Sequence, residues 1–129
     1  PTGQSNGVGM PAHSGKYDIQ ENHSISMAKE KNEITIARLF GNREYYANKE
    51  VKIRGVAVKV NENVMDRNWV HIQDGTSFNS NFDLTVTTND SITIGEEVTF
   101  KGKIILDKNF GSGYFYDIIM ENAELVDPF

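Results

Sequence analysis

The sequence has no cysteine among its 129 residues, and this absence removes several kinds of chemistry. Disulfide bonds, thiolate zinc sites and cysteine nucleophiles are all excluded. Long apolar runs are missing too, because no stretch approaches the roughly 20 apolar residues of a membrane-spanning helix. The composition, with 38% hydrophobic and 24% charged residues, is typical of a globular protein. The length predicts one domain.

A basic excess is also missing. Lysine and arginine total 13 against 18 acidic residues, so the formal net charge is −5. Proteins that bind polyanions in general carry a basic excess, because contacts to phosphates supply much of their affinity. The charge therefore argues against a general polyanion binder and leaves room only for a local basic patch.

Motifs for catalysis are missing as well. No glycine-rich phosphate loop precedes a helix, and no metal ligands follow a defined spacing. Ser77, His71 and Asp74 do not form a triad, because nothing places His71 to receive a proton from Ser77. We predict a protein with no enzymatic activity, no cofactor and no metal site.

The stretch most informative for fold and function covers residues 68–76, Asn-Trp-Val-His-Ile-Gln-Asp-Gly-Thr. It alternates like a strand, and its Asp-Gly pair indicates a tight turn. Val70 and Ile72 share one face, which we expect to join the core. The opposite face is aromatic and polar, and carries Trp69, His71 and Gln73.

Other stretches predict four further strands, over residues 50–61, 82–88, 97–107 and 114–125. In the first, the apolar positions change parity after Gly55, which predicts a β-bulge there. Residues 110–113 predict the hairpin turn before the last strand, whose Tyr114 and Tyr116 we expect to be partly in the core.

The N-terminal part differs from the rest. Residues 1–15 are rich in Gly, Ser, Pro and Asn and predict a flexible arm, and residues 17–27 predict a short edge strand or an extended arm. Ile36, Leu39 and Phe40 form a helical stripe with Thr35 as N-cap, and this helix is expected to continue to about Asn48.

Five strands in the order long and bent, short, short, long, long predict an all-β fold. They fit a five-stranded OB-fold Greek-key barrel over residues 16–129, sealed at one end by the single N-terminal helix. An SH3-like barrel and a small sandwich are the alternatives. A barrel accounts better for the bulge at Gly55, because closure needs a bent strand.

Several stretches resemble a family of exported bacterial OB-fold proteins that are described as nucleic-acid-binding proteins or lipoproteins. The resemblance spans residues 34–125 and rests on residues 51–60, 67–76 (Arg-Asn-Trp-Val-His-Ile-Gln-Asp-Gly-Thr), 83–88, 95–98 and 108–114. It implies a periplasmic or cell-envelope location, with the N-terminal arm as a tether after a leader. A lipid anchor would need a cysteine upstream of Pro1.

OB-folds bind ligands on the face of strands two and three and in the flanking loops. We therefore expect an exposed binding face, with aromatic stacking on bases and phosphate contacts from neighbouring strands. Its residues are Trp69, His71, Gln73, Thr85, Thr87, Lys52, Arg54 and Phe78. In the alternative reading, Trp69 packs under the N-terminal segment, His71 pairs with a backbone group and Phe78 caps the barrel rim.

The sequence thus predicts a non-enzymatic OB-fold module that binds single-stranded nucleic acid. The alternative function is a cell-envelope module that binds a protein or a small ligand through the same face.

Overall fold

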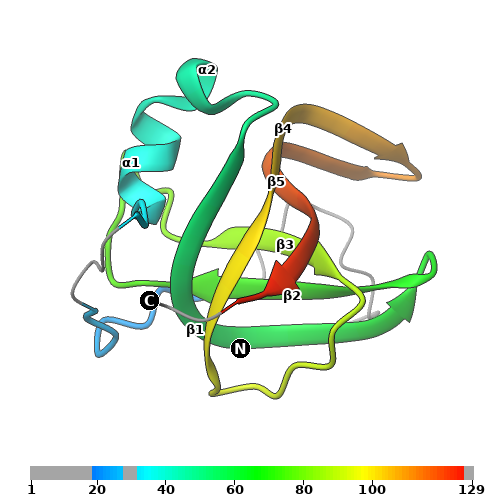
Figure 1. Cartoon of the computed structure of the whole chain (residues 1–129), viewed down its shortest axis with the longest axis horizontal. Helices are drawn as coiled ribbons and strands as arrows, with labels where there is room; N and C mark the ends of the chain where they lie inside the picture. The colour runs from blue at the N-terminus through cyan, green and yellow to red at the C-terminus, as the bar shows by residue number, and fades with distance from the viewer. Residues whose placement is uncertain (1–18, 28–31, 127–129) are drawn as a thin grey trace.

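The computed structural model, which describes residues 19–27 and 32–126, contains two short helices and five strands (Figure 1). The helices are α1 (Ile36–Gly41) and α2 (Arg43–Tyr46). The strands are β1 (Glu50–Val64), β2 (Arg67–Gln73), β3 (Leu84–Thr88), β4 (Glu97–Gly111) and β5 (Tyr114–Leu125). The predicted flexible arm, residues 1–15, lies outside the described residues.

The strands form one closed sheet in the order β1-β2-β3-β5-β4, with β4 pairing back onto β1. Every neighbouring pair is antiparallel except β3 and β5, which run parallel. The prediction of an all-β chain with five strands in a closed sheet is therefore confirmed. Residues 19–27 contain no strand, so the edge strand predicted there is wrong for those residues.

The bend in β1 is confirmed, but the predicted bulge is misplaced. Residues 50–56 pair with β4 and residues 56–64 pair with β2, so one strand serves two parts of the sheet. The register is regular across Gly55 and shifts between Ala57 and Lys59. Gly55 meets a different need, because a Cβ there would lie 2.8 Å from the Gln73 carbonyl oxygen.

Helix α1 begins where it was predicted to begin. The Thr35 hydroxyl accepts a hydrogen bond from the Arg38 amide at 3.0 Å. The Asp74 carboxylate accepts from the Ile36 amide at 2.9 Å, so the turn after β2 also caps this helix. The predicted single helix is two short ones, since α1 ends at Gly41 and α2 starts at Arg43.

Two hydrophobic clusters occupy the described chain. The main cluster fills the closed sheet, and Ile36, Leu39 and Tyr46 from the helices pack into it at one end. A second cluster joins Trp69 to the part of the β4–β5 hairpin that extends beyond the closed sheet (Figure 1). Its buried members are Trp69, Tyr114, Tyr116 and Ile119.

The two-residue turn between β1 and β2 predicts a stabilising substitution. Met65 and Asp66 have φ of 52° and 63°, as in a type I′ turn, whose second position favours glycine. We expect Asp66→Gly to raise the free energy of unfolding by about 0.5–1 kcal/mol, because glycine adopts this conformation without strain. Urea titration measures the change.

Glu62→Gly is the matched control for Asp66→Gly, because it also replaces an exposed carboxylate with glycine in the same hairpin. Glu62 has no positive φ and lies within β1, so this change is expected to destabilise by about 0.5–1 kcal/mol. The same sign of effect for both substitutions would contradict the assigned turn.

Candidate functional site

The predicted binding face is not displayed to solvent. Trp69 and Thr87 are 0% exposed, and none of the other residues on the β2–β3 part of this face exceeds 3%. The expectation that these side chains are exposed is wrong. The residues concerned are Trp69, His71, Gln73, Thr85 and Thr87.

Trp69 is enclosed by the extended β4–β5 hairpin. Its ring centroid lies 5.1 Å from that of Phe110 and 5.8 Å from that of Tyr116. Its indole N–H donates a hydrogen bond to the Val64 carbonyl oxygen at 2.8 Å. Both the ring and its polar atom are therefore used inside the protein, and no face remains for a base to stack on.

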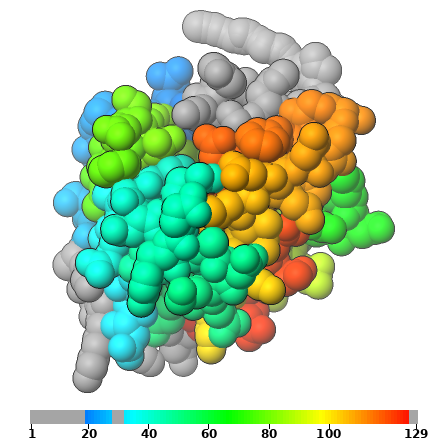
Figure 2. All heavy atoms as spheres, turned by 90° about the horizontal axis from the view of Figure 1, so that it is seen from above, coloured from blue at the N-terminus to red at the C-terminus, as the bar shows by residue number. Residues whose placement is uncertain are grey.

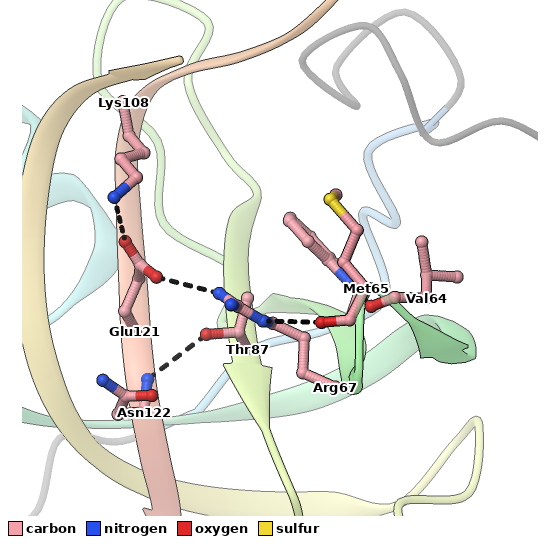
Figure 3. Close-up of polar contacts among 8 residues, drawn as sticks. Val64, Met65, Arg67, Thr87, Lys108, Glu121 and Asn122 are labelled. Atoms are coloured by element: carbon pink, nitrogen blue, oxygen red, sulfur yellow. Dashed lines mark hydrogen bonds and ion pairs between the residues drawn. The ribbon is translucent and has the colours of Figure 1, made fainter. Parts of the chain in front are cut away.

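A polar network closes the same region (Figure 3). Arg67 pairs with Glu121 at 3.1 Å, donates to the Met65 carbonyl oxygen, and places its guanidinium carbon 5.9 Å from the Trp69 ring centroid. Lys108 reaches the second Glu121 oxygen at 3.7 Å. The network therefore ties the β1–β2 hairpin to β4 and β5.

Thr87 and Gln73 are occupied by hydrogen bonds to the backbone. The Thr87 hydroxyl accepts from the Asn122 amide at 3.2 Å (Figure 3). The Gln73 side chain accepts from the Asn22 amide at 2.8 Å and donates to the Gln20 carbonyl oxygen at 2.9 Å. Gln73 therefore holds residues 20–22 against the end of β2.

Arg54, predicted to contact phosphate, is committed to two carboxylates. Its guanidinium lies 2.8 Å from Glu97 and 3.3 Å from Glu33, and its side chain is 12% exposed. The hydrogen bond that Arg54 donates to Glu97 is the main cause that raises the Arg54 pKa above its ordinary value, and burial opposes it. Lys52 is half-buried beside an open groove that Glu50, Val51 and Lys101 also line, and its phosphate contact stays a prediction.

Phe78 is partly exposed, as predicted, and it also packs on a helix. Phe78 is 42% exposed, and a Cβ atom added at Gly41 would lie 3.2 Å from the Phe78 ring. Phe78 therefore contacts the end of α1, which agrees with the alternative that it caps the rim.

The structure pairs two side chains that the sequence did not connect. His71 Nδ1 lies 2.7 Å from Asp83 Oδ2, and the side chains are 1% and 5% exposed. The two atoms share a hydrogen bond, whose donor depends on the tautomer of the imidazole ring. The other oxygen, Asp83 Oδ1, is buried without a hydrogen-bond partner in the described structure. Such an atom costs about 1–3 kcal/mol or more and needs an explanation.

Asp83 lies beside a narrow cleft between the beginnings of β3 and β5. These strands pair from Thr85 and Ile119 onward and separate before that point. The cleft has a volume of about 30 Å³, which is room for one small group. Figure 2 views the side of the molecule where α1, the loop before β3 and the beginning of β5 meet. The lining residues are Phe40, Asn81, Phe82, Asp83, Thr85, Tyr116, Asp117 and Ile118.

Sequence reasoning missed this cleft because it placed Asp83 and Thr85 on an outer, solvent-facing side. The sequence carried no local signal for it, because the contact depends on the register of β2 and β3, which places His71 opposite Thr85. In the described part of the chain, no group of three or more His, Asp or Glu residues is placed to hold a metal ion. No helix there has the length and apolar character needed to cross a membrane.

Comparison with known proteins does not identify a family. None of the protein-family models matches the chain, and no curated protein matches it significantly. The resemblance to exported OB-fold proteins therefore stays a prediction.

Proposed function

We propose that this chain is a non-enzymatic binding module with an OB-fold, and that its ligand enters the cleft between β3 and β5. The strand order β1-β2-β3-β5-β4, closed by the β4–β1 pairing, supports the OB-fold. A fold does not determine a function, so the ligand has to be argued from the site.

The observation that carries the proposal is the unpartnered Asp83 oxygen. A buried carboxylate normally has its lone pairs satisfied, and His71 satisfies only one of the two oxygens. The atom itself is buried, and it belongs to a residue that lines an open cleft, so a ligand in the cleft reaches it once the side chains that cover it move aside. Buried polar atoms left unsatisfied in this way occur at functional sites.

Between the two predicted functions, this geometry favours the protein- or small-ligand module over nucleic acid. The aromatic residue proposed to stack on bases is enclosed, and Arg54 is bonded to carboxylates. Among the described residues, no lysine or arginine lines the cleft, and the net charge of the whole sequence is −5. Phosphate binding needs several cationic side chains close together, and the described lining of this cleft contains none. The cell-envelope location is part of this proposal and rests on the family resemblance.

Oligonucleotide binding tests this choice. With labelled dT15 and rU15 in about 20 mM salt, we expect no saturable change in fluorescence anisotropy up to roughly 100 μM protein. Non-specific nucleic-acid binders have Kd values of about 1–100 μM even at physiological salt. Oligonucleotide binding that weakens steeply as the salt concentration rises would overturn this choice and favour the nucleic-acid function instead.

A second experiment tests the cleft itself. Wild-type chain, Asp117→Lys and Asp66→Lys are immobilised and exposed to the same cell-envelope extract. Asp117 is exposed at the cleft and Asp66 is exposed at the distant β1–β2 turn, so both variants change the charge equally. We expect a component that wild type and Asp66→Lys retain and Asp117→Lys loses. Equal retention by all three would place binding elsewhere.

A further inference from the structure

We infer that the cleft between β3 and β5 binds a primary ammonium group, carried by a lysine side chain or by a free alkylamine. This inference rests on the proposed function and adds the chemical class of the ligand. Three features of the site lead to it: an acceptor without a donor, aromatic walls and an excess of negative charge.

The acceptor is Asp83 Oδ1. His71 holds the other carboxylate oxygen at 2.7 Å, so the direction of the free oxygen is fixed in advance. Thr85 also lines the cleft, and its hydroxyl lies 3.4 Å from His71 Nδ1. An ammonium group supplies three N–H donors and a positive charge, and a hydrogen bond between ions is stronger than one between neutral groups.

The walls suit a cation on an apolar stem. Phe40, Phe82 and Tyr116 line the cleft, and aromatic rings attract cations through their electron-rich faces. Ile118 adds an aliphatic surface for methylene groups. Because the volume of the cleft is about 30 Å³, a slender primary amine fits better than a branched cation.

The charges around the cleft also favour a cation. Of the described residues that line it, Asp83 and Asp117 are acidic and none is basic. In the described part of the chain, the His71 ring and the Arg43 guanidinium lie near the cleft, and both are engaged. His71 pairs with Asp83, and Arg43 pairs with the Asp107 carboxylate while donating to the Asp117 carbonyl oxygen at 3.2 Å. The Asp117 carboxylate itself is therefore not the group that Arg43 neutralises.

The test is a titration of the full chain, labelled with ¹⁵N, followed by amide chemical shifts. n-Butylammonium is expected to shift the amides of Asp83, Thr85 and Ile118 with a Kd of about 1–10 mM, a usual range for five non-hydrogen atoms. n-Butanol lacks the charge and tetramethylammonium lacks N–H donors, so each is expected to bind at least about tenfold more weakly.

A further titration separates the two sources of the ammonium. Nα-acetyl-lysine methylamide carries the same group on a peptide-like backbone. Binding at least as tight as that of n-butylammonium assigns the cleft to a lysine of a protein partner, whereas clearly weaker binding assigns it to a free amine. Either result supports the ammonium class.

Variants make the inference falsifiable. Asp83→Asn keeps the shape and removes the charge, and it is expected to weaken n-butylammonium binding at least about tenfold. Asp117→Lys is expected to weaken it similarly, because it places a competing cation at an exposed position of the cleft. Asp66→Lys is the control and should leave the Kd unchanged. Should Asp83→Asn fail to fold, Asp117→Lys decides.

Two results would overturn the inference. If n-butanol binds as well as n-butylammonium, the cleft binds an apolar group. The proposed binding function would then hold, but the ligand would not be an ammonium group. If no probe shifts the cleft amides and the extract experiment also shows no effect of Asp117→Lys, both the inference and the proposed function fall.

Discussion

Replacing Trp69 with alanine is expected to lower the free energy of unfolding by about 3–5 kcal/mol, the usual cost of truncating a fully buried tryptophan. The side chain is 0% exposed and contacts Phe110, Tyr114 and Tyr116 through its ring. Its loss would leave a cavity between β2 and the β4–β5 hairpin. Because small domains are stable by only about 5–15 kcal/mol, the variant is expected to be partly unfolded at 37 °C.

Two controls separate packing from binding at this position. Trp69→Phe keeps an aromatic ring but removes the hydrogen bond to the Val64 carbonyl oxygen, so we expect a loss of about 1–2 kcal/mol in addition to the change in packing. Phe115→Ala changes an exposed residue of the same hairpin and is expected to stay within about 0.5 kcal/mol of wild type.

Urea titration followed by far-UV circular dichroism measures all three variants, because Trp69 is the one tryptophan and its removal abolishes the fluorescence signal. An unchanged midpoint for Trp69→Ala would mean that the ring is not packed. Trp69 would then again be a candidate for stacking on a nucleic-acid base.

The burial of Trp69 shows what alternation alone predicts and what it does not. The pattern of β2 correctly placed Val70 and Ile72 in the core, because residues two apart share a face. It carried no information on whether the opposite face is covered by a distant segment. That cover comes from Phe110, Tyr114 and Tyr116, some 40 residues further along the chain. Tyr114 and Tyr116 were correctly expected in the core, but their partner was not foreseen.

Local signals predicted local structure well. Thr35 was identified as the N-cap of α1, because a hydroxyl before a helical stripe accepts a free amide. The role of Asp74 in capping the same helix was not predicted, since it depends on how the turn after β2 meets α1. The bulge was placed at Gly55 because glycine often marks one, whereas this glycine makes room for the backbone of β2.

The candidate cleft could not be predicted from the sequence either, because it also depends on contacts between segments that are distant in the chain. Asp83 precedes Leu84, and simple alternation places its side chain on the face opposite the core. Its burial depends on pairing with His71 and on the separation of β3 from β5, a parallel pair that is distant in sequence. Cross-strand partners become visible only when the register of the sheet is known.

Replacing Arg54 with methionine is the second change with a large expected effect, a loss of about 3–5 kcal/mol in the free energy of unfolding. The Glu33 side chain is 3% exposed and lies 3.3 Å from the guanidinium. Methionine fills a similar volume but removes the Arg54 charge from beside this buried carboxylate, which is much more costly than losing an exposed ion pair. Chemical denaturation at pH 7 measures the loss.

The pH dependence of the Arg54 contribution follows from the direction of its pKa shift. The pKa of Arg54 is raised, so the stability that its charge provides is fully present below the ordinary arginine value and is lost only as the pH rises through the raised one. Between pH 5 and 9, we therefore expect Arg54 to stay charged and its contribution to stay constant.

Glu97→Gln and Glu33→Gln identify which carboxylate needs Arg54. The Glu97 side chain is 58% exposed, so its removal is expected to cost less than about 1 kcal/mol. Adding Glu33→Gln to Arg54→Met is expected to restore about 1–3 kcal/mol, because the uncompensated buried charge disappears. If Arg54 contacted phosphate instead, Arg54→Met would leave stability unchanged and weaken oligonucleotide binding, so the two measurements on one variant separate the structural role from the predicted one.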